Sequence, residues 1–145
     1  MNTHTAARQA FLPLMRELVR AYQAFASYDA AGYRDSELTV PQADVIFTLG
    51  NTDGLTLGEI GARTLITKGT LTGVIDRLEN KGLVQRLSCS EDRRCTRARL
   101  THKGKAVFEE EFPRQIRHLK SRFDRLSAAE QRSALLALRK LREVF

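Results

Sequence analysis

The sequence predicts one mainly helical domain of the α+β class, and three observations carry that prediction. Apolar residues recur at steps of three and four along most of the 145 residues, which is the spacing of an amphipathic helix. Around residue 90 two short stretches show the two-residue alternation of strands instead. Ser or Thr precedes Glu or Gln by three residues at several points, and such capping boxes mark where helices begin.

The first long helix is expected over residues 6–28. Its apolar stripe is spaced by three or four residues and consists of Phe11, Leu14, Leu18, Tyr22 and Phe25. Residues 32–37 break this pattern. Thr39 and Gln42 then form a T-x-x-Q capping box, which predicts the start of a short second helix.

Two further short helices follow, and both have marked starts. Thr56 and Glu59 form a T-x-x-E capping box, and Thr67 is the expected N-cap of a helix that runs to about Asn80. The apolar face of this second helix consists of Leu71, Val74, Ile75 and Leu78. Gly82 is free to adopt positive φ and ends the helix. Two short capped helices separated by three or four residues are what a helix-turn-helix requires.

Residues 83–101 change to two short stretches around a polar centre. We expect a β-hairpin with Arg97 and Arg99 on one face and Ala98 and Leu100 on the other. A hairpin directly after the second helix of a helix-turn-helix is the wing of a winged helix. The prediction is therefore a winged helix-turn-helix with long helices at the N- and C-terminal ends.

The last two helices have their own start signals. Thr101 caps a helix whose apolar stripe runs over residues 108–126, and Pro113 inside it is expected to bend the helix or open a hydrogen bond. Ser127 and Glu130 form a third capping box. The apolar positions of the final helix are Leu135, Leu138, Leu141 and Phe145.

The apolar stripes outside the winged helix need partners. We divide the chain as one domain over residues 1–145, with the winged helix at 38–100 and dimerisation helices at 6–30 and 101–145. Packing these helices against a second copy of the chain gives an isologous homodimer. Packing them only within one chain is the alternative.

The net charge of +7 is concentrated in one short segment. Residues 81–105 carry eight basic and two acidic residues, whereas residues 41–80 carry three basic and five acidic ones. A basic patch of this kind suits a polyanion, and nucleic acid is the first expectation. A basic face that is merely solvated is the alternative.

Three motifs occur in order along the chain: D-R-L-E-N-K-G-L-V at 76–84, D-R-R at 92–94 and L-T-H-K-G at 100–104. With the stretch that begins at Thr67, they resemble the recognition helix, the wing and the following helix of the MarR family of transcription regulators, and the resemblance covers nearly the whole chain. It implies a homodimer in which each winged helix docks on one half of a pseudo-palindromic operator in double-stranded DNA. Members of this family are commonly repressors that a small molecule, often a phenolic or lipophilic acid, or cysteine oxidation releases.

The N-terminal half of the recognition helix is expected in the major groove. The DNA-binding candidates there are short polar or basic residues and one glycine: Thr67, Lys68, Gly69, Thr70 and Thr72. The alternative for the threonines is capping and solvation, and for Thr67 we favour capping first. Arg77 either reaches a phosphate or pairs with a carboxylate of its own domain. Gly73 stands where many family members carry a DNA-contacting arginine, so we expect affinity to depend on the wing and on backbone contacts.

The wing supplies the remaining DNA-binding candidates, Arg86, Arg93, Arg94 and Arg97. By resemblance, one arginine at the tip enters the minor groove, where narrow A·T tracts concentrate negative potential. We expect this to be Arg94, with Asp92 supporting the tip through an ion pair. Arg93 and Arg97 are expected on phosphates, and Arg99 in solvent.

Cys89 and Cys95 flank the wing tip, and the hairpin places them where they can face each other. Neighbouring arginines lower the pKa of a thiol, which favours a redox-switched wing. We prefer the interpretation that both are ordinary small surface residues, because the cytosol keeps most thiols reduced. No secretory signal and no membrane-spanning apolar run occur, so the expected compartment is the cytoplasm and no membrane partner is expected.

Other function classes lack support in the sequence. No P-loop, G-x-G-x-x-G or G-x-S-x-G motif occurs, and the three histidines have no metal-ligand spacing. We therefore expect no enzyme activity, no cofactor and no metal. A sensor that binds a partner protein through its basic wing is the main alternative, and an enzyme that uses the winged helix as scaffold is another. A salt titration of binding to duplex DNA separates both from a regulator.

A small-molecule effector, phenolic or lipophilic, is the remaining expected partner. The resemblance places its site between the dimerisation helices and the winged helix. Tyr22, Phe25, Phe47 and His118 are candidates to line it. Each of them is more often a core or surface residue, so no ligand-binding residue is assigned.

Overall fold

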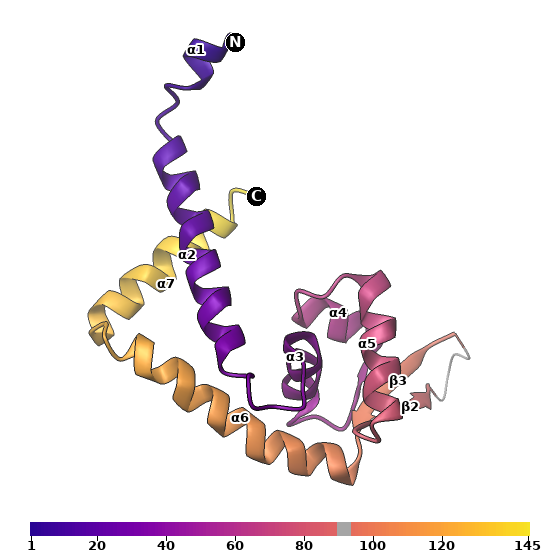
Figure 1. Ribbon diagram of the computed structural model, residues 1–145. Coiled ribbons are helices and arrows are strands. Elements are labelled where there is room, and N and C mark those ends of the chain that lie inside the picture. Colours follow the sequence, from indigo (N-terminus) through magenta and orange to yellow (C-terminus); the bar gives the residue numbers. More distant parts are fainter. Residues whose placement is uncertain (90–93) are drawn as a thin grey trace.

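The structure, a computed structural model, describes residues 1–89 and 94–145. It is a winged helix with long helices on either side of it in the chain (Figure 1). The elements in chain order are α1 Thr3–Ala6, α2 Leu12–Ala31, α3 Val40–Leu49, β1 Leu55–Thr56, α4 Leu57–Arg63, α5 Lys68–Asn80, β2 Val84–Ser88, β3 Thr96–Leu100, α6 His102–Phe123 and α7 Ala128–Arg142. The predicted class and the predicted winged helix-turn-helix are confirmed. No described helix is long and apolar enough to cross a membrane.

The capping boxes set the helix starts as predicted. In each box the first residue's hydroxyl accepts from the backbone N–H three residues later, and the Gln or Glu side chain accepts from the first residue's N–H. The three pairs are Thr39 with Gln42, Thr56 with Glu59, and Ser127 with Glu130. Two backbone donors that a helix start leaves unpaired are satisfied in each box.

The start predicted for the first long helix is wrong. α2 begins at Leu12 rather than at residue 6, and Pro13 occupies its first turn. A proline inside a helix removes a hydrogen bond and clashes with the preceding turn, whereas in the first turn its missing N–H has no consequence. The later Pro113 lies inside α6 on an exposed position, and the helix continues through it.

The core lies between α3, α4, α5 and the sheet. The predicted apolar face of α5 is fully buried there, with Leu71, Val74, Ile75 and Leu78 at 0–3% exposure. Gly82 adopts φ 71° as predicted. The L-T-x-x-G motif has a packing reason, since a Cβ on Gly104 would lie 2.0 Å from the carbonyl oxygen of Leu83. Thr101 completes this junction by donating to the Gly82 carbonyl (2.6 Å) and capping Gly104 N–H (3.0 Å).

The sheet has three antiparallel strands in the order β1-β3-β2. The predicted hairpin is present, and its register places Arg86 opposite Ala98 and Leu87 opposite Arg97. Ala98 is buried while Arg97 and Arg99 are exposed, as the alternation predicts. Strand β1 was not predicted, because two residues are too few to show a period of two; its Leu55 pairs with Ala98.

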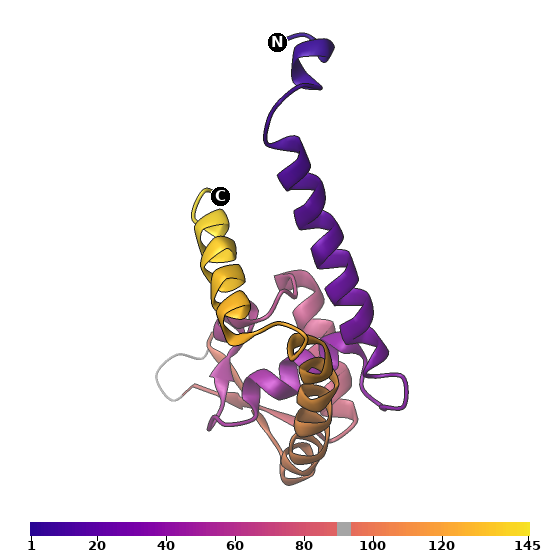
Figure 2. The same cartoon turned by 90° about the vertical axis from the view of Figure 1, so that its left-hand side faces the viewer.

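The flanking helices form two arms. α2 and α7 both reach toward the side where the two chain ends lie, α2 from its end next to α3 and α7 from the end of α6 (Figure 2), and neither has a buried residue. α2 crosses α6 through polar contacts: Gln115 Nε2 donates to the Asp29 carbonyl (3.1 Å), and His118 Nε2 lies 2.7 Å from the Tyr28 carbonyl. The Tyr28 and His118 rings stack with centroids 4.1 Å apart.

Candidate nucleic-acid interface

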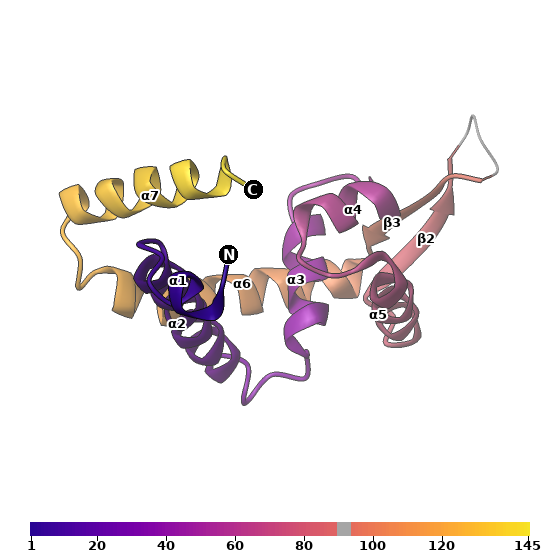
Figure 3. The same cartoon turned by 90° about the horizontal axis from the view of Figure 1, so that it is seen from above.

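The recognition helix α5 lies beside the wing at one end of the molecule, and α7 lies at the other (Figure 3). The side of α5 opposite its buried face is polar. Its exposed residues include the predicted DNA-binding candidates Lys68, Gly69, Thr70, Thr72 and Arg77. Helix and wing are thus presented together, away from the arms.

The first turn of α5 keeps backbone donors open to a ligand. Thr67 is the N-cap residue, as predicted, but its side chain makes no capping hydrogen bond. Its hydroxyl donates to the hydroxyl of Thr70 instead, at 3.0 Å, so the expected capping role is wrong. The first N–H groups of a helix lack partners within it, and together with the helix dipole they favour an anion such as phosphate.

Gly69 and Gly73 leave room on the exposed side of α5. A Cβ on Gly69 would meet no atom within 4 Å, so packing inside the protein does not require this glycine. Beside Gly73 lies the guanidinium of Arg77, whose Nη1 is 4.0 Å from the Cβ position. No ion pair joins Arg77 to another of the described residues. Its positive charge therefore stays at the exposed surface.

Arg86 has partners inside the protein that the sequence did not predict. Its guanidinium forms ion pairs with Asp76 and with Glu79, the latter at 3.0 Å between Nη1 and Oε1. Its backbone N–H also donates to Glu79 Oε2 at 3.1 Å. These carboxylates account for two of the five acidic residues in the segment 41–80. Arg86 compensates their charge and couples β2 to α5.

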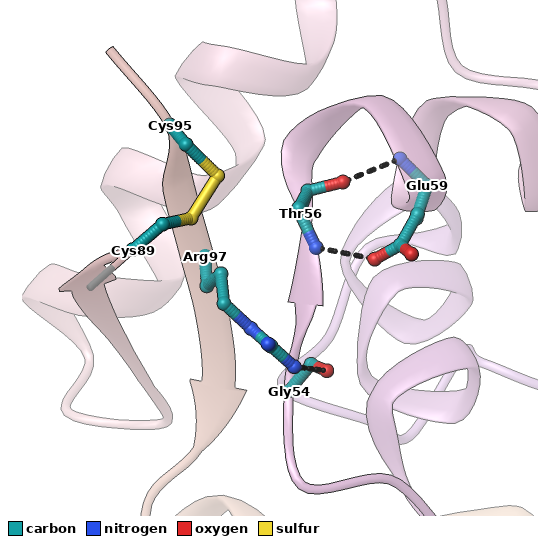
Figure 4. The surroundings of a disulfide bond; sticks show 6 residues. All are labelled: Gly54, Thr56, Glu59, Cys89, Cys95 and Arg97. Carbon is teal, nitrogen blue, oxygen red and sulfur yellow. Dashed lines mark hydrogen bonds between the residues drawn. A yellow bond between two sulfur atoms is a disulfide. The ribbon is translucent and has the colours of Figure 1, made fainter. Parts of the chain in front are cut away.

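Arg97 connects the wing to the turn before β1. Its Nη2 donates to the carbonyl oxygen of Gly54 at 2.7 Å, next to the Thr56–Glu59 capping box (Figure 4). A guanidinium has further N–H donors, so this contact leaves Arg97 able to reach a phosphate. Arg99, which we expected in solvent, is exposed and donates to Gln85 Oε1 at 3.3 Å.

A disulfide between Cys89 and Cys95 closes the base of the wing tip (Figure 4), so the preferred interpretation of both as ordinary small surface residues with free thiols is wrong. The register that pairs Ser88 with Thr96 brings these two residues opposite each other, with Cα atoms 5.3 Å apart. The N–H of Cys89 donates to the carbonyl of Cys95 at 3.1 Å. Arg94 directly precedes Cys95, on the tip side of the disulfide, and is exposed. Asp92 and Arg93, with the ion pair expected of Asp92, lie outside the described residues.

A cavity of about 590 Å³ lies behind the recognition helix. Its walls come from α2, α3, α6 and the segment that joins α4 to α5. Tyr22, Phe25 and Phe47, three of the four ligand candidates, line it. The fourth candidate, His118, does not line it; its ring stacks on Tyr28. Thr67 and Thr70, at the start of α5, face the cavity as well.

Comparisons with known proteins agree with this geometry. Residues 38–96 match the model of the MarR family. The HTH-type transcriptional regulator MhqR of Bacillus subtilis is 31% identical over 102 residues, which cover 70% of each chain. BpsR of Bordetella bronchiseptica, whose DNA binding is regulated by 6-hydroxynicotinic acid, superposes with a TM-score of 0.80 at 30% identity over 92% of this chain and 95% of that one. The MarR family transcriptional regulator Sco3205 of Streptomyces coelicolor, in complex with DNA, superposes with a TM-score of 0.81 at 25% identity. The superposition covers 90% of this chain and 84% of that one.

Proposed function

Because this chain belongs to the MarR family of DNA-binding transcription regulators, we propose that it is a homodimeric repressor that a small molecule releases from a pseudo-palindromic operator. The family is one of regulators and not of enzymes. The observation that carries the proposal is the coupling of α5 to the wing through Arg86 and Glu79. It presents two DNA-reading elements as one unit.

In the proposed complex the N-terminal half of α5 enters the major groove. Lys68 and the open N–H groups of the first turn contact phosphate, while Gly69 allows close approach of the backbone. Thr67, Thr70 and Thr72 supply hydroxyls for phosphates or base edges. Arg77 contacts a phosphate, which its lack of an ion pair among the described residues supports.

The wing completes the proposed contact with DNA. Arg94 enters the minor groove beside the half-site, and Arg93 and Arg97 lie on phosphates. Arg86, initially a DNA-binding candidate, serves to orient the wing, because its guanidinium is already engaged by two carboxylates. Backbone contacts and shape readout therefore carry much of the affinity.

Dimerisation through residues 6–30 and 101–145 is supported by the exposed apolar side chains of the arms α2 and α7, which lie within these segments. These side chains are 46–63% exposed: Leu14, Met15, Val19, Leu135, Leu136 and Leu138. Large apolar side chains gathered on the exposed faces of helices are typical of surfaces that bind a partner protein. A second copy covers the same surface on both chains when the two are related by a twofold axis.

The cavity behind α5 is the proposed effector site. Its size lies in the range of pockets that hold small molecules, about 300–1,000 Å³. Thr67 and Thr70 belong both to its lining and to the DNA-reading end of α5. A ligand there acts on DNA affinity if it binds better to a conformation of the protein that docks less well on DNA.

The proposal is tested by selecting bound sequences from a random pool of DNA duplexes. We expect a pseudo-palindromic consensus, bound by two copies of the chain, with an affinity that falls steeply as salt is raised. Recovery of no consensus, with equal weak binding to all duplexes, would favour the alternative of a sensor that binds a partner protein through its basic wing.

A further inference from the structure

The cavity behind α5 has an apolar body. Side chains from three helices and from the segment that joins α4 to α5 form it: Tyr22, Phe25, Phe47, Ile66, Ile116 and Leu119. Four aromatic residues, counting Tyr33, face the same space. Such walls bind the lipophilic part of a ligand, and the few polar groups among them decide which ligand is accepted.

The charged groups in the lining are mostly acidic. Asp29 from α2 and Asp44 from α3 both face the cavity, and Asp29 Oδ1 accepts a hydrogen bond from Gln115 Nε2 at 2.7 Å. Asp44 is half-buried. Burial raises the pKa of Asp44 above its ordinary value, the Asp29 carboxylate raises it further, and a hydrogen bond from the backbone of Leu65 opposes both.

The environment of Tyr33 indicates the same negative potential. Burial raises the pKa of its hydroxyl, and the nearby carboxylates, Asp29 first among them, raise it further. Arg114 opposes them, but its own guanidinium is paired with Glu111. Among the described residues, Arg63 is the one basic residue in the lining, and it is exposed at the end of α4. A chain of net charge +7 thus contains a cavity with two carboxylates and one peripheral cation.

We propose that this cavity binds a lipophilic cation, with a protonated amine facing Asp29 and Asp44 and an aromatic or aliphatic body against Tyr22, Phe25 and Phe47. An ammonium group gains from the desolvated carboxylate and from the faces of aromatic rings. A carboxylate ligand would instead lie close to two like charges in a site of low dielectric constant. The inference rests on the proposed function in taking this cavity as the effector site, and it differs from the acids that family resemblance implies.

The test compares three probes that share a phenethyl body and differ in the charged group. They are phenethylamine, hydrocinnamate and phenethyl alcohol, and their binding to the full-length protein without DNA is measured by calorimetry at neutral pH. We expect phenethylamine to bind about tenfold more tightly than hydrocinnamate, or more, with the alcohol between them. The comparison uses the unmodified protein, so it does not depend on the folding of any variant.

Variants then locate the charge that sets this preference. Asp29→Asn and Asp44→Asn should each weaken phenethylamine binding and narrow its advantage over hydrocinnamate. Asp53→Asn removes an exposed carboxylate outside the cavity and should change neither. Arg63→Gln should leave amine binding intact, whereas it would abolish hydrocinnamate binding if Arg63 were the ligand's partner.

Three results would overturn the proposal: hydrocinnamate binding at least as tight as phenethylamine binding, no amine binding at millimolar concentration, or an amine preference that survives both Asn variants. A separate titration against operator DNA keeps the two proposals apart. If the amine binds through the two aspartates but does not release DNA, the ligand class stands and ligand-controlled repression fails. If the protein binds no operator, the proposed function fails, and calorimetry still decides the ligand class.

Discussion

The carboxylate of Glu79 on α5 binds Arg86 on β2 twice, once at the guanidinium (3.0 Å) and once at the backbone N–H (3.1 Å). One residue of the recognition helix thereby fixes both a side chain and the strand of the wing. Exposed ion pairs contribute little to stability, and the Glu79 carboxylate is 42% exposed. The contact therefore matters more for the orientation of the wing relative to α5 than for the free energy of unfolding.

Removing this contact should weaken DNA binding without removing a phosphate contact. Arg86→Ala should lower operator affinity severalfold and stability by at most about 1 kcal/mol, while the slope of log K against log salt stays unchanged. Glu79→Gln is the decisive companion. If Arg86 positions the wing, Glu79→Gln also weakens binding; if Arg86 contacts phosphate, removing a nearby negative charge strengthens it. Fluorescence anisotropy with a labelled operator measures both.

The half-buried carboxylate of Asp44 should make the protein less stable as pH rises. Its folded-state pKa is raised above the unfolded value, so below the unfolded pKa it is protonated in both states and carries no penalty. As pH rises through the unfolded and then the folded pKa, the unfolded state releases its proton first and stability is lost. Asp44→Asn should therefore stabilise the protein at neutral pH and have little effect near pH 3, roughly below the ordinary Asp pKa. Urea unfolding at both pH values checks this, and an equal effect at both would contradict it.

The apolar arms should hold two copies together. Sedimentation at micromolar concentration should give twice the 16.4 kDa of one chain. Leu138→Asp, on α7, should shift the protein toward the monomer because it places a charge within the proposed interface. Gln85→Asp adds the same charge to an exposed residue of the wing and should leave the mass unchanged. A monomeric wild-type protein would remove the basis for a pseudo-palindromic operator.

The features that sequence predicted well are those with a local cause. A capping box such as Thr56–Glu59 is decided within four residues, and the buried face of α5 follows from its own spacing. The contacts it missed join distant parts of the chain: Arg97 with Gly54, and Gln115 with Asp29. Nothing near Arg86 in the sequence distinguishes a guanidinium that orients the wing from one that binds phosphate. Only the packing of β2 beside α5 brings the Glu79 carboxylate within reach of the Arg86 guanidinium.

The disulfide should influence DNA binding through the wing tip. Joining Cys89 to Cys95 restricts the positions that Arg94 can adopt and so reduces the ordering that binding requires. Reduction should weaken operator binding a few-fold and reoxidation should restore it. The double variant Cys89→Ser, Cys95→Ser should behave like the reduced protein in either condition. Equal operator affinity before and after a reduction verified by thiol titration would show that the bond has no part in recognition.

Lys68 and Arg94 should affect DNA binding in different ways, because one is placed at the helix start and the other at the wing tip. Lys68→Ala removes one phosphate contact, so it should weaken all sequences alike and flatten the salt slope by roughly one unit. Arg94→Ala should cost more, on the order of 1–3 kcal/mol, and relax the preference for A·T pairs that flank the half-site.

Affinities for the selected operator and for a version with G·C flanks, each measured across a salt series, separate the two effects. Arg117→Ala is the matched control, since it removes a positive charge from an exposed residue of α6 that lies outside the basic segment 81–105. Its effect on both duplexes should be small, because charges beyond about one Debye length, roughly 8 Å at physiological salt, are largely screened. If Arg94→Ala keeps wild-type affinity and still prefers A·T flanks, the minor groove is read by another residue. In that case α5 and backbone contacts carry the selectivity without the wing.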